Sequence, residues 1–170
     1  MTESKAAPEL IGELKRVHRS YASGVTIVTT ESEGVPFGLA VNAFSSVSFD
    51  PPTVLVCINV SSSTYPKFFT GSNFGISILS SAQSAVAARF ATSGGNKFAG
   101  VRWKKGDFGA PLIEGAAAHL ELKIASMLLA GTHTIIIGEV LGAAASGDAP
   151  LIYHNGGFYD GSRLFAAEAK

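Results

Sequence analysis

Hydrophobic and polar positions alternate with a period of two along much of the chain, a pattern that predicts β-strands. The clearest alternation runs over residues 116–124, where Leu120 and Leu122 are interleaved with His119, Glu121 and Lys123. Successive side chains of a strand point to opposite faces. This segment is therefore predicted to have one apolar face and one polar face.

Further strands are predicted from β-branched and apolar runs that lie between turn signals. They are Val25–Thr30, Phe37–Ala43, Val47–Phe49, Thr53–Val60, Phe74–Leu79 and Thr134–Leu141. Residues 53–60 read TVLVCINV, and this nearly unbroken apolar run predicts a strand that is buried on both faces. A weaker strand pair is predicted around Asn155-Gly156-Gly157, because Asn-Gly is a strong hairpin signal.

Helical spacing is confined to short segments. Leu10, Leu14, Val17 and Tyr21 recur at intervals of three or four, which predicts one amphipathic helix that begins near Pro8 and is ended by Ser23-Gly24. Short helices are also predicted from Ser61 through Phe69 and over Ala82–Phe90. Residues 91–111 are rich in glycine and are predicted to form a long loop, a feature that is often functional.

The order of these elements favours a mainly β fold with short helices. The six or seven predicted strands show no alternation of strand and helix, so an antiparallel barrel is favoured over a Rossmann-type sheet. We expect residues 1–8 to be a frayed N-terminus and residues 9–170 to form a single domain.

The composition adds an anomaly to this picture. Charged residues make up 15% of the 170 residues, hydrophobic residues make up 46%, and there are 19 glycines. About 25% charged residues is usual for soluble domains. So little charge predicts a large apolar subunit interface, a large apolar ligand, or both.

Several function classes are excluded by charge and by the distribution of apolar residues. The 13 Lys and Arg balance the 13 Asp and Glu, which argues against a nucleic-acid partner. The apolar segment 124–145 contains Thr132, His133, Thr134 and Glu139, so no membrane span is expected. The start of the chain has no leader-like apolar run, and Cys57 is the only cysteine. We therefore expect a cytoplasmic protein without disulfides.

Common catalytic signatures are missing. The sequence has no G-x-G-x-x-G, no P-loop and no G-x-S-x-G. His18, His119, His133 and His154 lack metal-ligand spacing, so no metal site is expected. If the protein is an enzyme, its chemistry is expected to come from an organic cofactor.

Four segments are candidates for ligand binding, and each has a structural alternative. Residues 40–49 (AVNAFSSVSF) are small, hydroxyl-bearing and uncharged, which suits either a Ser-rich strand or a surface for a flat polar heterocycle. Residues 61–67 (SSSTYPK) suit either N-capping or an anion site at a helix start. The lone His133 and the aromatic residues of segment 153–159 are each explained as well by ordinary strand packing.

Taken in order along the chain, these segments resemble the flavin reductase family with the FMN-binding split-barrel fold, a Greek-key-like antiparallel barrel. The resemblance covers roughly residues 12–160. The matching stretches are Ala22–Thr30 (ASGVTIVTT), Gly38–Phe49 (GLAVNAFSSVSF), Asp50–Asn59 (DPPTVLVCIN), Ser61–Thr64 (SSST), Phe74–Gln83 (FGISILSSAQ), Phe98–Gly106 (FAGVRWKKG), Pro111-Leu112, Gly131-Thr132-His133 and Pro150–Tyr153 (PLIY).

The resemblance implies a set of flavin-binding residues. Those expected to line the flavin are Ala40, Val41, Asn42, Ser45, Ser46 and Val47, and those expected at its ribityl or phosphate end are Ser61, Ser63 and Thr64. Residues expected to back the same pocket are Cys57, Ile58, Phe74 and Ser80. Residues expected at the nicotinamide or at the flavin edge are Ser23, Gly24, Val25, His133 and Tyr153, with Lys97 and Phe98 in a loop over the cofactor.

The resemblance also implies an activity. Members of the family are NAD(P)H:flavin oxidoreductases that supply reduced FMN or FAD to a partner monooxygenase, so we expect NADH or NADPH and FMN or FAD as cofactors. No covalent catalyst is expected, and His133 is a positioning residue. Homodimers are expected, with no nucleic-acid or membrane partner. Two alternatives stay open: a flavoprotein that retains its flavin and reduces a corrinoid or metal centre, and a non-catalytic flavin- or haem-binding protein.

Overall fold

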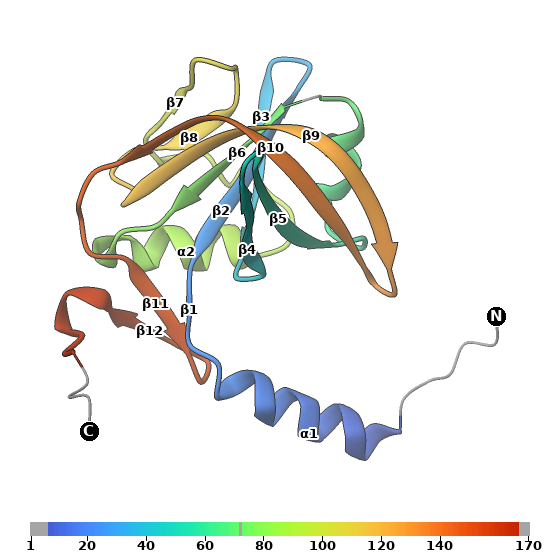
Figure 1. Cartoon of the computed structure of the whole chain (residues 1–170), viewed down its shortest axis with the longest axis vertical. Helices are drawn as coiled ribbons and strands as arrows, with labels where there is room; N and C mark the ends of the chain where they lie inside the picture. Colours follow the sequence, from blue (N-terminus) through green and yellow to red (C-terminus); the bar gives the residue numbers. More distant parts are fainter. Residues whose placement is uncertain (1–6, 72, 167–170) are drawn as a thin grey trace.

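Seven strands form one strongly curved antiparallel sheet in the computed structural model, which describes residues 7–71 and 73–166 (Figure 1). From edge to edge they are β3 (Val35–Val41), β2 (Thr26–Ser32), β6 (Asn73–Ile78), β9 (Ala118–Ala130), β10 (His133–Ala145), β5 (Pro52–Asn59) and β4 (Phe44–Phe49). Every pairing in this sheet is antiparallel. The prediction of a mainly β, antiparallel barrel of six or seven strands is thereby confirmed.

The two edge strands of the sheet, β3 and β4, are consecutive in the chain. Only Asn42 and Ala43 separate them, so the sheet must curl until its two edges meet at this corner. We call the gap between β3 and the segment that follows β5 the seam of the barrel. The long β9–β10 hairpin lies between β6 and β5 and joins the two halves of the sheet (Figure 1).

Smaller elements surround the barrel (Figure 1). A three-stranded sheet contains β1 (Ser23–Gly24), β11 (Leu151–His154) and β12 (Gly157–Asp160), and a two-stranded sheet contains β7 (Trp103–Lys105) and β8 (Pro111–Ile113). The helices are α1 (Pro8–Arg19) and α2 (Ser84–Ala91), with short 3-10 turns η1 (Tyr65–Phe69), η2 (Ser81–Gln83) and η3 (Gly161–Arg163). The predicted Asn155-Gly156 hairpin is present between β11 and β12, with positive φ at both residues, as its turn type requires.

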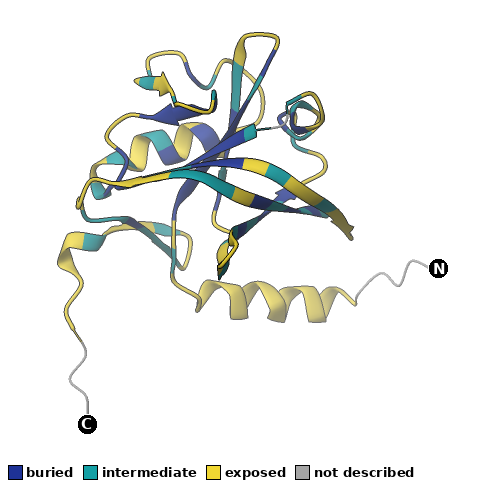
Figure 2. Cartoon of the chain, turned by 45° about the horizontal axis from the view of Figure 1, so that its top comes forward, coloured by how far each residue is buried: buried dark blue, intermediate teal, exposed yellow. Residues whose placement is uncertain are grey.

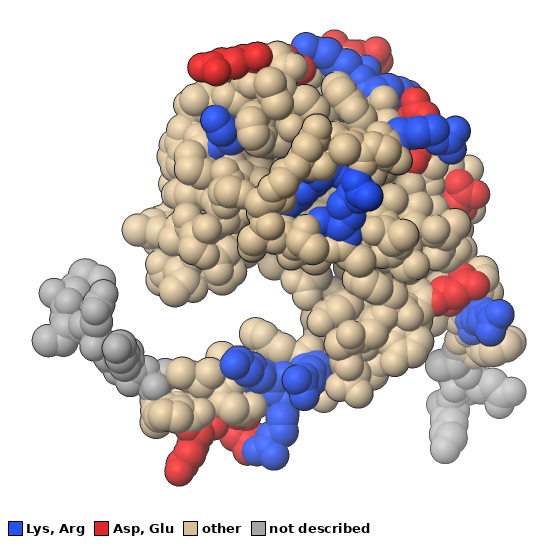
Figure 3. Space-filling view, turned by 180° about the vertical axis from the view of Figure 1, so that it is seen from behind, with Lys and Arg blue, Asp and Glu red and all other residues tan. Residues whose placement is uncertain are grey.

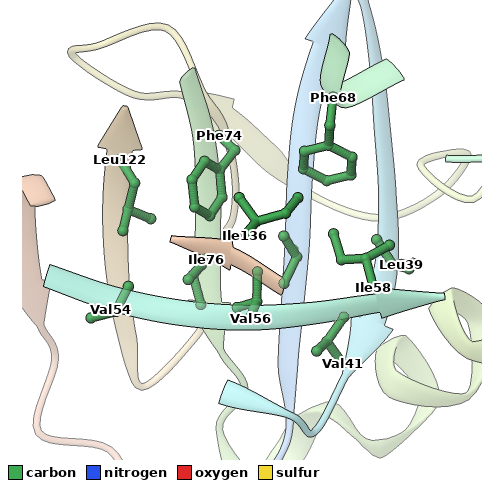
Figure 4. Packing of buried hydrophobic residues seen from close by; sticks show 11 residues of the cluster. Leu39, Val41, Val54, Val56, Ile58, Phe68, Phe74, Ile76, Leu122 and Ile136 are labelled. Atoms are coloured by element: carbon green, nitrogen blue, oxygen red, sulfur yellow. The ribbon is translucent and has the colours of Figure 1, made fainter. Parts of the chain in front are cut away.

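Two hydrophobic clusters stabilise these layers. The larger fills the barrel interior, and Figure 4 shows Phe74 and Ile76 of β6, Ile136 of β10 and Val56 of β5 converging there. The smaller cluster lies outside β2 and is covered by α2, whose Phe90 packs edge-on against Phe98 at 5.1 Å. Strand β2 therefore lies between two apolar layers, which explains why it is buried on both faces.

Strand β5 differs from its prediction, because only one of its faces is buried. Val54, Val56 and Ile58 point into the barrel, whereas Leu55 and Cys57 between them are half-exposed. The apolar residues on the outer face of β5 are therefore only partly covered in the single chain.

One prediction in the second half of the chain is also corrected. The predicted loop 91–111 contains β7 and reaches the first residue of β8. Glu121 lies on β9 in the predicted alternation, and it is buried because residues 106–110 fold over it. Its Oε1 accepts hydrogen bonds from the backbone N–H groups of Phe108 (2.9 Å) and Ala110 (3.1 Å), which satisfy the buried carboxylate.

Helix α1 begins at Pro8, as predicted, but it ends at Arg19, and Ser23-Gly24 forms β1 instead of a helix stop. No residue of α1 is buried, and Figure 2 shows the helix exposed along its length and standing apart from the barrel. The segment predicted as a helix from Ser61 is a turn followed by η1. Residues 1–6 of the predicted frayed terminus lie outside the described residues.

None of the described helices is long and apolar enough to cross a membrane.

Candidate functional site

Three adjoining hollows follow strand β3 along the seam. The first measures about 220 Å³ and is walled by Val25, Ala40, Val41, Asn42, Tyr153 and Phe158, together with Ala87 and Ala91 of α2. The second measures about 280 Å³ and lies between Ala40 and the hydroxyl-rich segment Ser61–Ser63. The third measures about 430 Å³ and lies between residues 35–38 and residues 94–98. Because the first and second share Ala40 and Ala91, and the second and third share Ser63 and Lys97, we treat the three as one groove.

The groove follows a strand edge whose backbone groups are free of the sheet. β3 is an edge strand and pairs only with β2. In an antiparallel pair, hydrogen-bonded and non-hydrogen-bonded residues alternate. Pro36 has no N–H, so it occupies a non-hydrogen-bonded position, and Gly38 and Ala40 must follow it in the same phase. Their backbone N–H and C=O groups therefore point to the seam. The carbonyl of Gly38 is bonded to Thr64, whereas the backbone groups of Ala40 are available to a ligand.

Helix α2 forms the wall of the groove that faces β3. The helix can approach this strand closely because residue 38 is a glycine. A Cβ atom at Gly38 would lie 2.8 Å from Cε1 of Phe90, which is too close for any other residue. Ala87 and Ala91 lie one helical turn apart on α2. Their short side chains leave space between the helix and Ala40. Sequence reasoning did not include these two alanines: Ala87 lies on the helix predicted over residues 82–90, but Ala91 was assigned to the loop that follows it.

The segment between β5 and η1 is held against β3 by its own side chains. Asn59 Oδ1 accepts hydrogen bonds from the backbone N–H (2.9 Å) and the hydroxyl (2.8 Å) of Ser61. Thr64 Oγ1 donates to the carbonyl of Gly38 over 3.1 Å and is buried. Among the described residues, neither the N–H nor the hydroxyl of Ser63 has a hydrogen-bond partner. Ser63 therefore offers two donors where the second and third hollows meet.

Lys97 lies at the same junction. Its Nζ donates to the carbonyl of Phe90 over 3.2 Å, and partial burial lowers the pKa of the ammonium group below its ordinary value. No Asp or Glu is among the described residues that line the second and third hollows. Figure 3 shows a group of Lys and Arg side chains at the centre of one face of the barrel, with the other charged side chains of this view nearer the rim and on α1. The junction is therefore suited to an anionic group.

The far end of the groove is built by the small three-stranded sheet. Ser23 pairs with Tyr153 across β1 and β11, and the Tyr153 ring packs against Phe158 at 5.7 Å between ring centroids. The hydroxyl of Ser23 is buried and has no hydrogen-bond partner among the described residues. A buried hydroxyl without a partner is unusual and costs stability. Gly24, next to it, is exposed.

His133 lies at the first residue of β10, opposite Asn59 of β5. Its imidazole is half-buried, and Nδ1 lies 3.0 Å from the hydroxyl of Thr132. Thr134, the next residue, is buried and its Oγ1 lies 2.9 Å from the hydroxyl of Tyr65. His133 therefore points away from the barrel interior, on the same side of the sheet as Asn59, which lines the second hollow.

The remaining residues of the predicted site line none of the three hollows. Ser45, Ser46 and Val47 are exposed on the edge strand β4. Cys57 is half-exposed on the outer face of β5, and Ile58 and Phe74 are fully buried in the barrel core. Ser80 is buried, and its hydroxyl donates to the carbonyl of Gly115 over 2.7 Å.

The described residues contain no group of three or more His, Cys, Asp or Glu side chains arranged to hold a metal ion. The groove instead combines an apolar end, a free strand edge and a cationic, hydroxyl-rich middle. These features fit a ligand with a flat ring at one end and a phosphate farther along, which is the chemistry of a flavin nucleotide. The observation on which this fit depends is that Ser63 and Lys97 face the groove with unshared donors and no opposing carboxylate.

Comparison with known proteins gives the same ligand class. Residues 18–162 match the family model described as "Flavin reductase like domain". The chain is 42% identical over 151 residues to FMN reductase (NADH) SmoA of Agrobacterium fabrum, with 86% of each chain covered. It is 38% identical over 150 residues to the reductase component of the flavin-dependent trigonelline monooxygenase of Acinetobacter baylyi, covering 88% of this chain but only 48% of that relative.

A solved structure has the same architecture. The NADH:FAD oxidoreductase SgcE6 of Streptomyces globisporus, in complex with NAD and FAD fragments, superposes with a TM-score of 0.85 at 34% identity. The superposition covers 98% of this chain and 99% of that one.

Proposed function

Because the chain belongs to the family of flavin reductase-like domains, we propose that it oxidises NAD(P)H and transfers a hydride to FMN or FAD. With one proton from solvent, the products are NAD(P)⁺ and reduced flavin. The reduced flavin passes to a partner monooxygenase, a role supported by the relative that is the reductase component of such an enzyme. A cytoplasmic location fits a reaction that consumes NAD(P)H and a chain with one cysteine.

The groove along β3 is the observation that supports this function. Once bound, a flavin supplies the electron-accepting ring that receives the hydride, so no nucleophilic side chain is needed. The protein contributes binding and orientation. The apolar walls of the first hollow exclude water from one side of the ring, and the free backbone groups of Ala40, with the Asn42 side chain, orient its polar edge.

Ser63 and Lys97 hold the phosphate in this proposal. The unshared N–H and hydroxyl of Ser63 donate to it, and the ammonium group of Lys97 balances its charge. Ser61 is already bonded to Asn59, so its role is to shape the turn. Thr64 anchors the same turn to β3.

His133 and Tyr153 are proposed for the nicotinamide side of the reaction. Tyr153 lines the first hollow, where the flavin ring is placed, so a nicotinamide stacked on that ring would lie near it. The half-buried imidazole of His133 is accessible near the second hollow and serves as a positioning donor. Neither residue is needed for covalent chemistry.

A homodimer is the second part of the proposal, because one chain leaves two apolar surfaces uncovered. On the outer face of the sheet, Ile137 pairs with Leu55 and Ile135 with Leu128. Leu128 is 61% exposed, and the other three side chains are only partly buried. On α1, Leu14 and Val17 are 52% and 63% exposed. Stable dimers bury about 800 Å² per partner, most of it apolar at the centre. Ser45 pairs with Leu55 and lies on the same outer face of the sheet. We therefore propose that Ser45 and Ser46 contact flavin within the dimer.

Sedimentation tests the dimer. Leu14→Glu places a charge on the apolar face of α1 and is expected to shift the protein towards monomer. Lys15→Glu introduces the same residue on the charged side of the same helix and is expected to leave the dimer intact. Because α1 has no buried residue, neither change should disturb folding. A wild-type protein that sediments as a monomer would overturn the proposal.

An anaerobic titration tests the reaction. We expect the visible absorbance of FMN or FAD to bleach when NADH or NADPH is added with the protein, much faster than without it. Ala91→Leu should fill the groove where the first and second hollows meet and should weaken the binding of both flavins. No acceleration with any pair of FMN or FAD and NADH or NADPH would refute the function.

A further inference from the structure

The third hollow is the largest part of the groove, and the binding of a flavin ring and its first phosphate leaves it unused. At about 430 Å³ it extends past Ser63 and Lys97, away from the apolar first hollow. Its walls are residues 35–38 of β3 on one side and residues 94–98 on the other. An FMN whose phosphate lies at the junction would end before this hollow begins.

The junction has capacity for more than one phosphate group. Ser63 and Lys97 line both the second and the third hollow, so a charged group between them is reached from either side. The side of Ser63 that faces the groove has two unshared donors, and Lys97 has a full charge to balance because no carboxylate lines these hollows. A ligand that passes through the junction as a diphosphate would use these groups fully.

The walls of the third hollow suit an aromatic ring joined to phosphate. Phe37 and Phe98 contribute aromatic surface, and the ammonium group of Lys67 lies 4.8 Å from the centre of the Phe37 ring. Val35 and Pro36 add apolar surface, and Asn96 adds an amide. A purine has the flat, weakly polar faces that such walls bind, and its edge offers hydrogen-bonding groups to an amide.

From these observations we propose that the third hollow is the subsite for the adenylate half of FAD, and that the protein prefers FAD to FMN. The inference rests on the proposed function, since it assumes that the flavin ring occupies the first hollow. It adds the choice of flavin and the residues that make that choice. Phe37 is the main specificity-determining residue, because among the three hollows it lines only the third.

Continuity of the groove favours FAD over the adenylate of NAD(P)H as the occupant. One FAD molecule runs from ring to ribityl chain, diphosphate and adenosine in a single path, and the three hollows meet in that same order through shared residues. A pyridine nucleotide must instead place its nicotinamide against the flavin ring, so its path starts outside the first hollow. The two occupants predict different effects of the same substitution.

Calorimetric titration of the oxidised, full-length protein tests the subsite without relying on turnover. The ligands are riboflavin, FMN, FAD, ADP and NADH, and the variants are Phe37→Ala, Phe37→Leu, Lys97→Met and Ala91→Leu. We expect the wild type to bind FAD about tenfold more tightly than FMN. Phe37→Ala should remove most of that difference while leaving FMN and riboflavin binding unchanged. Phe37→Leu keeps an apolar side chain that can pack in the same place, so its effect on FAD binding should be smaller.

The other variants and ligands separate the alternatives. Lys97→Met should weaken FMN and FAD but not riboflavin, and Ala91→Leu should weaken all three flavins alike. ADP should compete with FAD and should bind together with riboflavin. Equal affinities for FMN and FAD, or a loss of NADH affinity but not of FAD affinity in Phe37→Ala, would overturn the subsite. Failure of every flavin to bind the wild type would instead overturn the proposed function.

Discussion

The hydroxyl of Thr64 donates a hydrogen bond to the backbone carbonyl of Gly38 over 3.1 Å, and this bond fastens the turn after β5 to the free edge of β3. Both partners are buried, so the carbonyl has no access to water if the hydroxyl is removed. The bond also fixes the distance between the phosphate donors of the turn and the strand that orients the flavin ring. It therefore affects both stability and ligand binding.

Thr64→Val tests this link, because valine keeps the shape of the side chain and removes the donor. We expect the free energy of unfolding to fall by about 1 to 2 kcal/mol, the cost of a buried carbonyl without a partner. FMN and FAD should bind more weakly, whereas riboflavin, which has no phosphate, should be affected less. Thr64→Ser restores the hydroxyl and should recover phosphate-dependent affinity; if Thr64→Val and Thr64→Ser behave alike, the hydrogen bond has no such role.

Ser23 presents the reverse case, a buried hydroxyl with no partner among the described residues. Ser23→Ala should therefore raise the free energy of unfolding, by about 1 kcal/mol, since it removes an unsatisfied polar group. Ser80→Ala is the matched control, because the Ser80 hydroxyl is buried but bonded to the carbonyl of Gly115, and its loss should be destabilising. Chemical denaturation of both variants gives the comparison. Destabilisation of Ser23→Ala in the absence of ligand would show that its hydroxyl has a partner.

The lowered pKa of Lys97 predicts that flavin affinity and the stability of the fold change with pH in opposite directions. Burial lowers the pKa of its ammonium group in the folded protein, so the unfolded chain binds this proton more tightly. Without flavin, the stability of the fold should therefore rise as pH increases through the window between the lowered pKa and the ordinary lysine value. A bound phosphate raises the pKa again, so the affinity for FMN should fall across the same window.

Titrations at several alkaline pH values measure both slopes. Riboflavin is the ligand control, because it has no phosphate and its affinity should not follow Lys97. Lys97→Met should remove the rise in stability and the fall in FMN affinity together. A variant that keeps either slope would assign that slope to a different group.

His133→Ala is expected to raise KM for the pyridine nucleotide several-fold while changing flavin affinity little. The reason is its position: the half-buried imidazole faces outward opposite Asn59, beside the groove and not inside it. Steady-state kinetics together with flavin titration separates the two effects. His154→Ala, at the end of β11, is a control that should change neither. Equal losses of nucleotide and flavin affinity would contradict the positioning role.

The strand pattern of the chain was predictable where burial differs between the two faces of a strand. Alternation predicted the first half of β9, and the Asn155-Gly156 turn predicted β11 and β12, because these signals are local. Strand β5 was misjudged because an apolar residue on a strand does not reveal which element covers it. The burial of Glu121 could not be predicted, because its hydrogen-bond donors, Phe108 and Ala110, come from a loop whose path is set by tertiary packing.

The candidate site was likewise predictable from the sequence only in part. The segments 40–42 and 61–64 were identified from residue types and from family resemblance, and the structure brings them to adjoining hollows. The part contributed by α2 was not identified, since Ala87 and Ala91 have no chemistry of their own and matter only because Gly38 lets the helix approach. The third hollow was anticipated only through Lys97 and Phe98, which were expected in a loop over the cofactor. The meeting of this loop with β3 and with the turn after β5 is set by tertiary packing.

The position of the β9–β10 hairpin also determines how the chain can fold. Strands β2 to β6 all precede residue 79, yet they belong to two separate groups, β3-β2-β6 and β5-β4, which contact each other in the sheet only through the hairpin at residues 118–145. The barrel therefore cannot close during synthesis until the hairpin has left the ribosome, and its non-local pairing favours slow folding. A chain cut within residues 91–102 should give two fragments that are unfolded alone and regain the barrel when mixed.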